Sequence, residues 1–319
     1  MAREVPVYLF TGFMDSGKTS LIQETIYENG FAEENDRMLI IACEDGDEEY
    51  NEDKLATVRT KVAMIEDEDD FNLATLKALD EKYRPDAVFL EYNGTWEVQP
   101  LYEMELPKDW IIVQSLATVD STTFDTYMLN MRSMMMEQLF RAEVVIFNRC
   151  DENTPKAKYR ASIKSFNRPA QIVYELKDGS IDNSPEELPF DMNAPVLEIT
   201  DADYALWFMD VQDNAKKYDG KTVHFKALVY NPPGKLKRDV MVPGRFAMTC
   251  CVEDIQFLGL KCKTRDAAKY AHKSWIDITA TVKNEFATEY RGKGPVLYPT
   301  KIEPAEAPAT QEEGLVYFS

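Results

Sequence analysis

The chain has 319 residues, 45% of them hydrophobic and 11% aromatic, which is enough for two domains that each bury a core. Its 56 acidic and 36 basic residues give a formal net charge of −20 at pH 7. A chain this acidic is repelled by phosphate backbones and anionic membranes, so we exclude nucleic acid as its main partner.

The first predicted element is an apolar strand at residues 5–10, which leads through a glycine-rich loop into a helix-compatible stretch at residues 20–28. The loop, Gly12 to Thr19, fits the full G-x-x-x-x-G-K-[ST] pattern in its required setting of strand, loop and helix. Lys18 of this pattern reaches the β- and γ-phosphates of a nucleotide, and the Thr19 hydroxyl ligates Mg²⁺. We expect these residues to bind nucleotide phosphates: Gly12, Asp15, Ser16, Gly17, Lys18, Thr19 and Ser20.

An acidic loop and a third predicted strand follow. A strand at residues 38–42 delivers Glu44 into the acidic loop, where it is a further candidate for Mg²⁺, although most acids in such a run are solvated. A helix at residues 71–83 ends before the strand at residues 86–91. The carboxylate of Glu91 at the end of that strand is expected to face Mg²⁺ and its waters, which makes Glu91 a metal-shell and catalytic candidate together with Lys18.

The next elements predict a guanine site. Strands at residues 110–119 and 142–147 flank a helix at 123–141, and the second strand ends in Asn148-Arg149-Cys150-Asp151. In an Asn-x-x-Asp pattern, the carboxylate of Asp151 accepts from N1–H and the 2-amino group of guanine, which adenine does not offer, and Asn148 supports the loop and the base edge.

With a last strand at residues 170–174, strands and helices alternate through this half of the chain. Alternation of this kind predicts an α/β fold of the P-loop NTPase type, a mostly parallel αβα sheet with its ligand at the carboxyl ends of the strands.

This half resembles the CobW/UreG/HypB class of P-loop GTPases, and most of all its CobW-like branch. Besides the glycine loop, the resemblance rests on five short motifs: Glu91-Tyr92-Asn93-Gly94 (E-x-x-G), Val119-Asp120, Gln138-x-x-x-Ala142, Asn148-x-x-Asp151 and Phe166-Asn167-x-Pro169. It implies slow, Mg²⁺-dependent GTP hydrolysis coupled to metal delivery or metal-centre assembly. We place the GTPase domain at residues 1–190.

Two departures from the family pattern stand out. Arg149 replaces the lysine of the usual N-K-x-D motif, and it can still stack over a base. CobW-like metallochaperones carry a C-x-C-C motif that holds the cargo metal, whereas residues 62–70 of this chain contain no cysteine. The usual cargo site is therefore missing.

A proline-rich boundary at residues 180–195 precedes the second predicted domain, residues 193–319. A short strand at 196–199 and a helix to residue 217 come first. Five further strands predict a small closed β-rich barrel of the OB type: 222–230, 246–252, 259–263, 275–283 and 296–302.

The second half resembles the C-terminal domain of YcgQ-like permease-associated proteins. The resemblance is carried by Lys217-Tyr218-x-Gly220-Lys221-x-Val223, Arg245-Phe246-x-Met248-x-Cys250-Cys251-x-x-Asp254, Gly259-Leu260, Trp275 and Val316-Tyr317-Phe318. It implies the handling of a metal, zinc above all, beside a permease partner.

Three cysteines leave two interpretations open. Cys250 or Cys251, together with Cys262 and a nearby acid, would make a mixed thiolate and carboxylate Zn²⁺ site. Adjacent strand residues point to opposite faces, so the alternative is one core cysteine and two incidental ones.

Features of the whole chain indicate a cytoplasmic protein that is not embedded in a membrane. No apolar run is long enough to cross a bilayer, the N-terminus carries no signal sequence, and five cysteines make no even disulfide framework.

The sequence thus predicts a GTPase that uses GTP or GDP and Mg²⁺, with Zn²⁺ as a further candidate. Its partners would be the guanine nucleotide and a protein client or permease in metal handling. The alternative is a guanine-nucleotide-binding scaffold or sensor that does not hydrolyse GTP and acts through the barrel.

Overall fold

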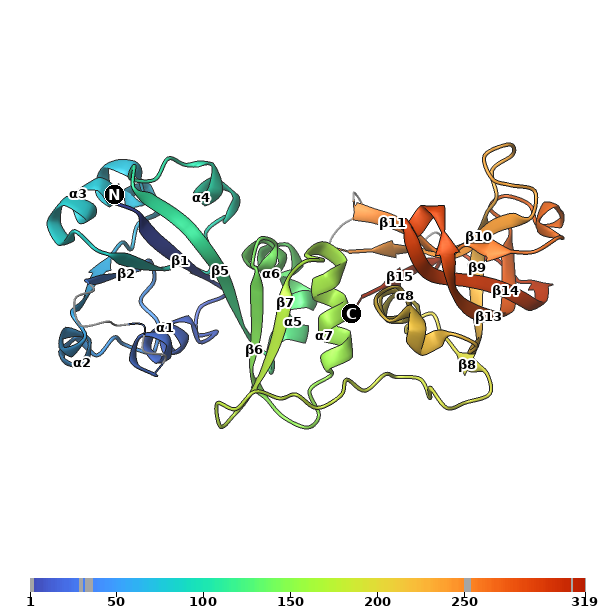
Figure 1. Ribbon diagram of the computed structural model, residues 1–319, viewed down its shortest axis with the longest axis horizontal. Helices are drawn as coiled ribbons and strands as arrows, with labels where there is room; N and C mark the ends of the chain where they lie inside the picture. Colours follow the sequence, from blue (N-terminus) through green and yellow to red (C-terminus); the bar gives the residue numbers. More distant parts are fainter. Residues whose placement is uncertain (1–2, 29–30, 32–36, 250–253, 311, 319) are drawn as a thin grey trace. The chain divides into compact units, whose positions relative to one another are not determined.

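The computed structural model describes residues 3–28, 31, 37–249, 254–310 and 312–318 (Figure 1). The chain divides into two compact units. The first consists of Met1–Thr154 with Phe166–Ser184, and the second of Pro155–Ser165 with Pro185–Ser319. Across the described ranges, no helix is both long enough and apolar enough to span a membrane.

Seven parallel strands form the sheet of the first unit, in the order β3-β2-β4-β1-β5-β6-β7. The strands are β1 (Val5–Thr11), β2 (Met38–Ala42), β3 (Thr60–Met64), β4 (Ala87–Glu91), β5 (Trp110–Asp120), β6 (Val144–Cys150) and β7 (Gln171–Leu176). The helices are α1 (Lys18–Glu28), α2 (Glu52–Thr57), α3 (Leu73–Tyr83), α4 (Gln99–Glu103), α5 (Phe124–Asn130) and α6 (Arg132–Leu139). The predicted parallel α/β sheet is confirmed.

Apolar side chains of β1 leave the sheet on both faces, as a buried parallel strand requires. Val7 and Leu9 join a cluster with Leu76 of α3, whereas Phe10 joins a cluster with Ile22 of α1. Figure 1 accordingly shows α1 and α2 on one face of this sheet and α3 and α4 on the other. The central strand is thereby fixed on both sides, and the loop that follows it starts from a rigid base.

Two segments differ from the sequence prediction. The helix expected at residues 123–141 is interrupted at Met131, where φ is −136° and ψ is 35°, so that α5 and α6 are separate helices. The segment before α3 contains a helix, α2, and a strand, β3, that were not predicted. Strand β3 is an edge strand with only one residue, Thr60, fully buried, so its sequence lacks the apolar run of a central strand.

The second unit contains a closed barrel. Strands β9 (Thr222–Tyr230), β10 (Val240–Met248), β12 (Cys262–Lys263), β14 (Gly292–Pro304) and β13 (Trp275–Ala287) pair in this order, and β13 returns to β9. Three more strands extend the sheet: β8 (Leu197–Glu198), β11 (Ile255–Gly259) and β15 (Leu315–Tyr317). The predicted β-rich, OB-like barrel is confirmed, with parallel pairing of β12 and β14 inside it.

The strand expected at residues 246–252 begins earlier, at Val240. Pro243 and Gly244 therefore lie inside β10, where Gly244 pairs with Gly259. A Cβ atom on Gly244 would lie 2.4 Å from the Leu258 carbonyl oxygen and 2.7 Å from the ring of Phe257. Glycine is needed here because another strand and an aromatic ring approach the backbone closely.

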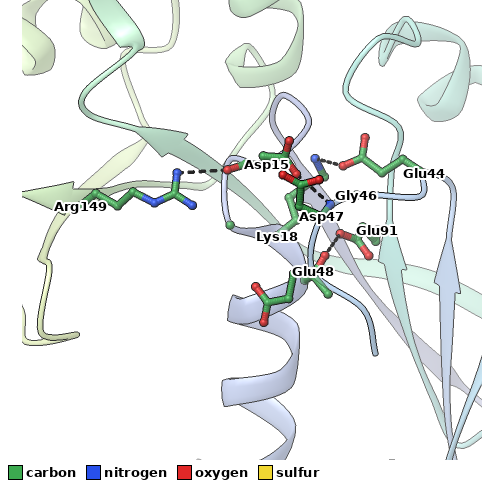
Figure 2. A pocket seen from close by; sticks show the side chains of 10 residues that line it. Asp15, Lys18, Glu44, Gly46, Asp47, Glu48, Glu91 and Arg149 are labelled. Atoms are coloured by element: carbon green, nitrogen blue, oxygen red, sulfur yellow. Dashed lines mark hydrogen bonds and ion pairs between the residues drawn. The ribbon is translucent and has the colours of Figure 1, made fainter. Parts of the chain in front are cut away.

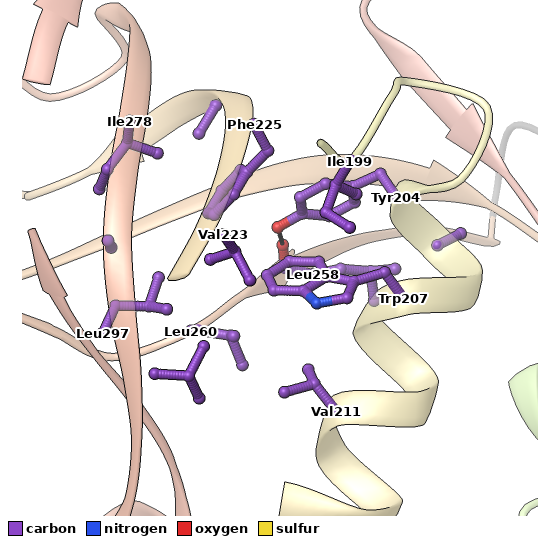
Figure 3. Packing of buried hydrophobic residues seen from close by; sticks show 14 of the residues in the cluster. Ile199, Tyr204, Trp207, Val211, Val223, Phe225, Leu258, Leu260, Ile278 and Leu297 are labelled. Carbon is purple, nitrogen blue, oxygen red and sulfur yellow. Dashed lines mark hydrogen bonds between the residues drawn. The ribbon is translucent and has the colours of Figure 1, made fainter. Parts of the chain in front are cut away.

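Helix α8 (Tyr204–Asp213) contributes aromatic side chains to the core of the barrel. The Trp207 ring is fully buried, and its centroid lies 5.0 Å from that of Phe225 on β9 (Figure 3). The Tyr204 hydroxyl donates a hydrogen bond to the Leu258 carbonyl oxygen at 2.9 Å. Helix α7 (Lys156–Phe166) joins this unit for all but its last residue, and Arg160 binds the buried Asp210 at 3.1 Å.

We expect the barrel to depend on the inward side of β13. Ile278→Ala should destabilise it by about 2–5 kcal/mol, because Ile278 is fully buried and its truncation leaves a cavity. Phe286→Ala on the same strand is the control, since Phe286 is 65% exposed and surface changes shift stability by less than about 0.5 kcal/mol. Urea denaturation measures both, and equal shifts for the two variants would contradict the assigned core.

Candidate nucleotide-binding site

The glycine loop joins the end of β1 to the start of α1. Gly12 and Gly17 have φ of 127° and 99°, values that only glycine adopts without strain. A Cβ atom on Gly17 would lie 2.4 Å from Nδ2 of Asn148. That same Nδ2 donates to the Ser16 carbonyl oxygen at 2.6 Å. The Asn148 side chain therefore contacts the glycine loop from the neighbouring strand end.

The ammonium group of Lys18 is buried within the loop. Its Nζ donates to the carbonyl oxygens of Gly12 at 2.7 Å and Phe13 at 2.8 Å. It also lies 2.5 Å from Oε1 of Glu44, and the two side chains are only 1% and 5% exposed. The other carboxylate oxygen of Glu44 accepts from the backbone N–H of Gly94 at 2.9 Å. In this structure Glu44, a residue expected beside Mg²⁺, contacts Lys18 instead, the lysine expected to bind phosphate.

Glu91 lies at the carboxyl end of β4 with two hydroxyl donors. Thr19 Oγ1 donates to Oε1 of Glu91 at 2.7 Å, and the Tyr50 hydroxyl donates to Oε2 at 2.5 Å. Burial raises the pKa of Glu91, and the two hydrogen bonds only partly offset it. Mg²⁺ binds oxygen ligands, and the adjacent oxygens of Thr19 and Glu91 beside the phosphate loop fit that requirement.

The acidic loop, which we define as residues 44–50, lines the pocket in front of the glycine loop (Figure 2). Two more contacts join this loop to the glycine loop and the start of α1. The backbone N–H of Asp47 donates to the Asp15 carboxylate at 3.2 Å, and the Ser20 hydroxyl donates to the Glu48 carboxylate. The pocket is lined by Asp15, Gly17, Lys18, Thr19, Glu44, Gly46, Asp47, Glu48, Glu91 and Arg149. The structure thus brings the predicted phosphate and Mg²⁺ residues together.

The residues predicted to read the base lie at and just after the end of β6, with Asn148 inside the strand and Asp151 directly after it. The Asp151 carboxylate is 43% exposed and pairs with Lys177 at 3.0 Å, and the hydrogen bond from Lys177 lowers the pKa of Asp151. Arg149, with φ of 54°, donates to the Asp15 carbonyl oxygen at 3.1 Å and forms an ion pair with Asp120. Asp151 does not line the phosphate pocket, so the two halves of the predicted nucleotide site are adjacent loops rather than one cluster.

The predicted zinc ligands are placed only in part. Cys250 and Cys251 lie outside the described residues. Cys262 is fully buried in the apolar core of the barrel, and burial raises the pKa of its thiol to about 12. The described part of the chain contains no group of three His, Cys, Asp or Glu side chains arranged to hold a metal ion.

Three residues that hold the site were not predicted as site residues. A Cβ atom on Gly94 would lie 2.6 Å from the Gly12 carbonyl oxygen, so Gly94 packs directly on the glycine loop. The side chain of Gln138 accepts from the Gly12 backbone N–H at 3.2 Å and donates to the Trp96 carbonyl oxygen at 2.9 Å. Both belong to motifs noted in the sequence, whereas no pattern marked Tyr50.

Comparison with known proteins identifies both halves. Residues 6–174 match the CobW/HypB/UreG nucleotide-binding domain, and residues 175–312 match the DUF1980 C-terminal domain, which confirms the two resemblances seen in the motifs. No curated protein matches the sequence.

Three solved structures are similar to the chain. A Zn(II)-bound triple mutant of the YjiA GTPase is 18% identical, with 70% of this chain and 72% of that chain covered and a TM-score of 0.44. Hydrogenase maturation factor HypB from Archaeoglobus fulgidus is 19% identical, with 56% and 84% covered and a TM-score of 0.39. FlhF complexed with GMPPNP and Mg²⁺ is 13% identical, with 55% and 67% covered and a TM-score of 0.33.

The raised pKa of Glu91 predicts a pH-dependent stability. Since burial favours the protonated acid, the folded protein loses stability as the pH rises through this pKa, and Glu91→Gln has no such loss. The variant should therefore gain stability over the wild type between about pH 4 and about pH 7.5. Denaturation midpoints at both pH values measure the difference, with exposed Glu97→Gln as the control. A difference that does not change with pH would contradict the prediction.

Proposed function

The chain belongs to the CobW/HypB/UreG family, and from this premise we propose that it binds a guanine nucleotide with Mg²⁺ and hydrolyses GTP slowly. The nucleotide state regulates a protein partner in metal homeostasis. The observation that carries the proposal is the buried ammonium of Lys18, held at 2.7 Å and 2.8 Å by two carbonyl oxygens of a loop with glycines at positive φ. Glycines at positive φ let successive backbone N–H groups form a concavity for phosphate oxygens, and the lysine adds a positive charge beside it.

Each residue has a separate part in the proposed reaction. The loop amides and Lys18 hold the phosphates, and Thr19 with Glu91 holds the metal and its water shell. Mg²⁺, when bound, neutralises charge on the β- and γ-phosphates. Phosphoryl transfer depends on positioning and charge neutralisation, so no side-chain nucleophile is needed.

The loop after β6 supports the choice of guanine. The Asp151 side chain is exposed, and its lowered pKa keeps the carboxylate ionised. Its ion pair with Lys177 lies at the surface, so the carboxylate is accessible to the N–H groups of a base. Asn148 holds the phosphate loop from the same segment. This link between base and phosphate elements positions both ends of one nucleotide.

The output of the GTPase is proposed to lie in the second domain. Residues 62–70 lack the cysteines of the family's cargo motif, and part of this segment is the edge strand β3. We place the functional boundary between a GTPase domain at residues 1–190 and a barrel domain at residues 193–319. The barrel is the part through which a client or permease is engaged, with zinc as the metal concerned.

A second candidate is a guanine-nucleotide-binding scaffold or sensor with negligible turnover. Its support is that Glu44 contacts Lys18 and that Tyr50 contacts Glu91, so the acidic loop engages both groups that hydrolysis needs. In this case the nucleotide would act as a structural ligand.

Lys18→Ala should lower GTP turnover by at least about 100-fold, because it removes a positive charge from the transition state. The wild type should turn over GTP faster than ATP. Phosphate release measures both, and Lys108→Ala, which removes an exposed lysine of the same unit, is the control. Equal turnover by wild type and Lys18→Ala, or a preference for ATP, would overturn the assignment.

Single-turnover hydrolysis separates the two candidates. Wild-type protein in excess over GTP, with Mg²⁺, should convert the bound GTP to GDP, and Zn²⁺ should change the rate if metal handling is coupled to the switch. Intact GTP after many hours would favour the scaffold. Metal analysis of wild type, Cys250→Ser and Cys262→Ser tests the zinc ligands, and a metal content unchanged by both substitutions would exclude these thiols.

A further inference from the structure

The Glu44 carboxylate is bound by two groups at the mouth of the glycine loop. Oε1 lies 2.5 Å from Nζ of Lys18, and Oε2 accepts from the backbone N–H of Gly94 at 2.9 Å. The Glu44 side chain is 5% exposed, so this is a buried contact and not an ion pair on the surface. An anionic side chain thus sits against two donors that also suit phosphate oxygens.

All N–H donors of the Lys18 ammonium and the backbone N–H of Gly94 already have acceptors. A lysine ammonium has three N–H donors. Two of those of Lys18 go to the carbonyl oxygens of Gly12 and Phe13, and the third faces Glu44. Gly94 has a single backbone N–H, which Glu44 also takes. A phosphate oxygen therefore binds Lys18 and Gly94 only if the Glu44 carboxylate leaves them.

The position of Gly94 indicates which phosphate competes. Gly94 follows Glu91 by three residues and packs on the start of the glycine loop, where its Cβ would lie 2.7 Å from the Phe13 Cα. Glu91 and Thr19 are the residues that would hold Mg²⁺, which would neutralise the charge of the outer phosphates on their side of the pocket. The terminal phosphate of a triphosphate faces this side, whereas a diphosphate ends within the loop.

We infer that Glu44 is an internal stand-in for the terminal phosphate and sets the selectivity of the site between nucleoside triphosphates and diphosphates. This inference rests on the proposed function. A diphosphate takes Lys18 through its β-phosphate but leaves the contact between Glu44 and Gly94 in place, whereas a triphosphate displaces Glu44 from both donors. The triphosphate therefore binds against a competitor that the chain itself supplies, and its binding releases one end of the acidic loop.

The experiment is titration calorimetry of the full chain with Mg²⁺ and either GDP or a non-hydrolysable GTP analogue. Glu44→Gln removes the charge, and Glu44→Asp keeps the charge but is too short to reach both donors. Glu49→Gln removes a charge from an exposed position in the same loop and is the control. Thermal unfolding of each variant shows whether it folds.

Both Glu44 variants should bind the GTP analogue about 10-fold more tightly than the wild type, since a buried charge-assisted contact no longer competes. Their affinity for GDP should rise by less, about 3-fold at most, because the contact between Glu44 and Gly94 does not oppose a diphosphate, and Glu49→Gln should leave both affinities close to those of the wild type. Where one Glu44 variant fails to fold, the other gives the result.

Three results would overturn the inference. They are unchanged or weaker binding of the GTP analogue to the Glu44 variants, equal tightening for both nucleotides, and the same tightening by Glu49→Gln. If wild type and both Glu44 variants bind neither nucleotide, the proposed function fails and the inference fails with it. Binding that appears only in the Glu44 variants would support both.

Discussion

Burial of the Lys18 ammonium is the constraint on which the first unit depends. A charge whose side chain is 1% exposed is stable only when all its N–H groups are hydrogen-bonded or ion-paired. The backbone carbonyls of Gly12 and Phe13 meet most of this need, in a loop where Gly12 and Gly17 take positive φ. The loop shape and the lysine therefore require each other, and the rigid strand β1 behind them holds both in place.

The surrounding acids follow from that charge. Glu44 forms the ion pair with the Lys18 ammonium, and Glu91 close by accepts hydrogen bonds from the hydroxyl groups of Thr19 and Tyr50. Burial raises the pKa of Glu91, so keeping it ionised destabilises the fold at neutral pH. A carboxylate retained at such a disadvantage is typical of a functional site rather than of a packing position. The acidic loop thus contacts both Lys18, through Glu44, and Glu91, the residue proposed to hold the metal, through Tyr50.

Much of this could be predicted from the sequence, because the features concerned are local. The glycine loop, Glu91 at a strand end and the Asn148 segment follow from patterns whose spacing fixes their geometry. The partners of Glu44 could not be predicted, since neighbouring acids in one run look alike until the chain folds. Tyr50 reaches Glu91 from another segment, and no pattern marks it. The early start of β10 could not be predicted either, since the close approach of another strand to Gly244 is not visible in the sequence.

In the second unit, a series of short strands allowed the barrel to be predicted from the sequence. The barrel closes because β9 pairs with both β10 and β13. The aromatic side chains of α8 pack into the core of this barrel. The fully buried Cys262 belongs to this core, so a role in metal binding would require the thiol to leave it. The glycine-loop site and the barrel therefore depend on different interactions, electrostatic in the first and apolar in the second.

The most direct test of the account is a crystal structure of the chain with Mg²⁺ and a non-hydrolysable GTP analogue. The account predicts terminal phosphate oxygens within about 2.7–2.9 Å of Lys18 Nζ and the Gly94 backbone nitrogen, with the Glu44 carboxylate moved away from both. A nucleotide bound outside the glycine loop, or a triphosphate in the loop with Glu44 still on Lys18, would contradict it.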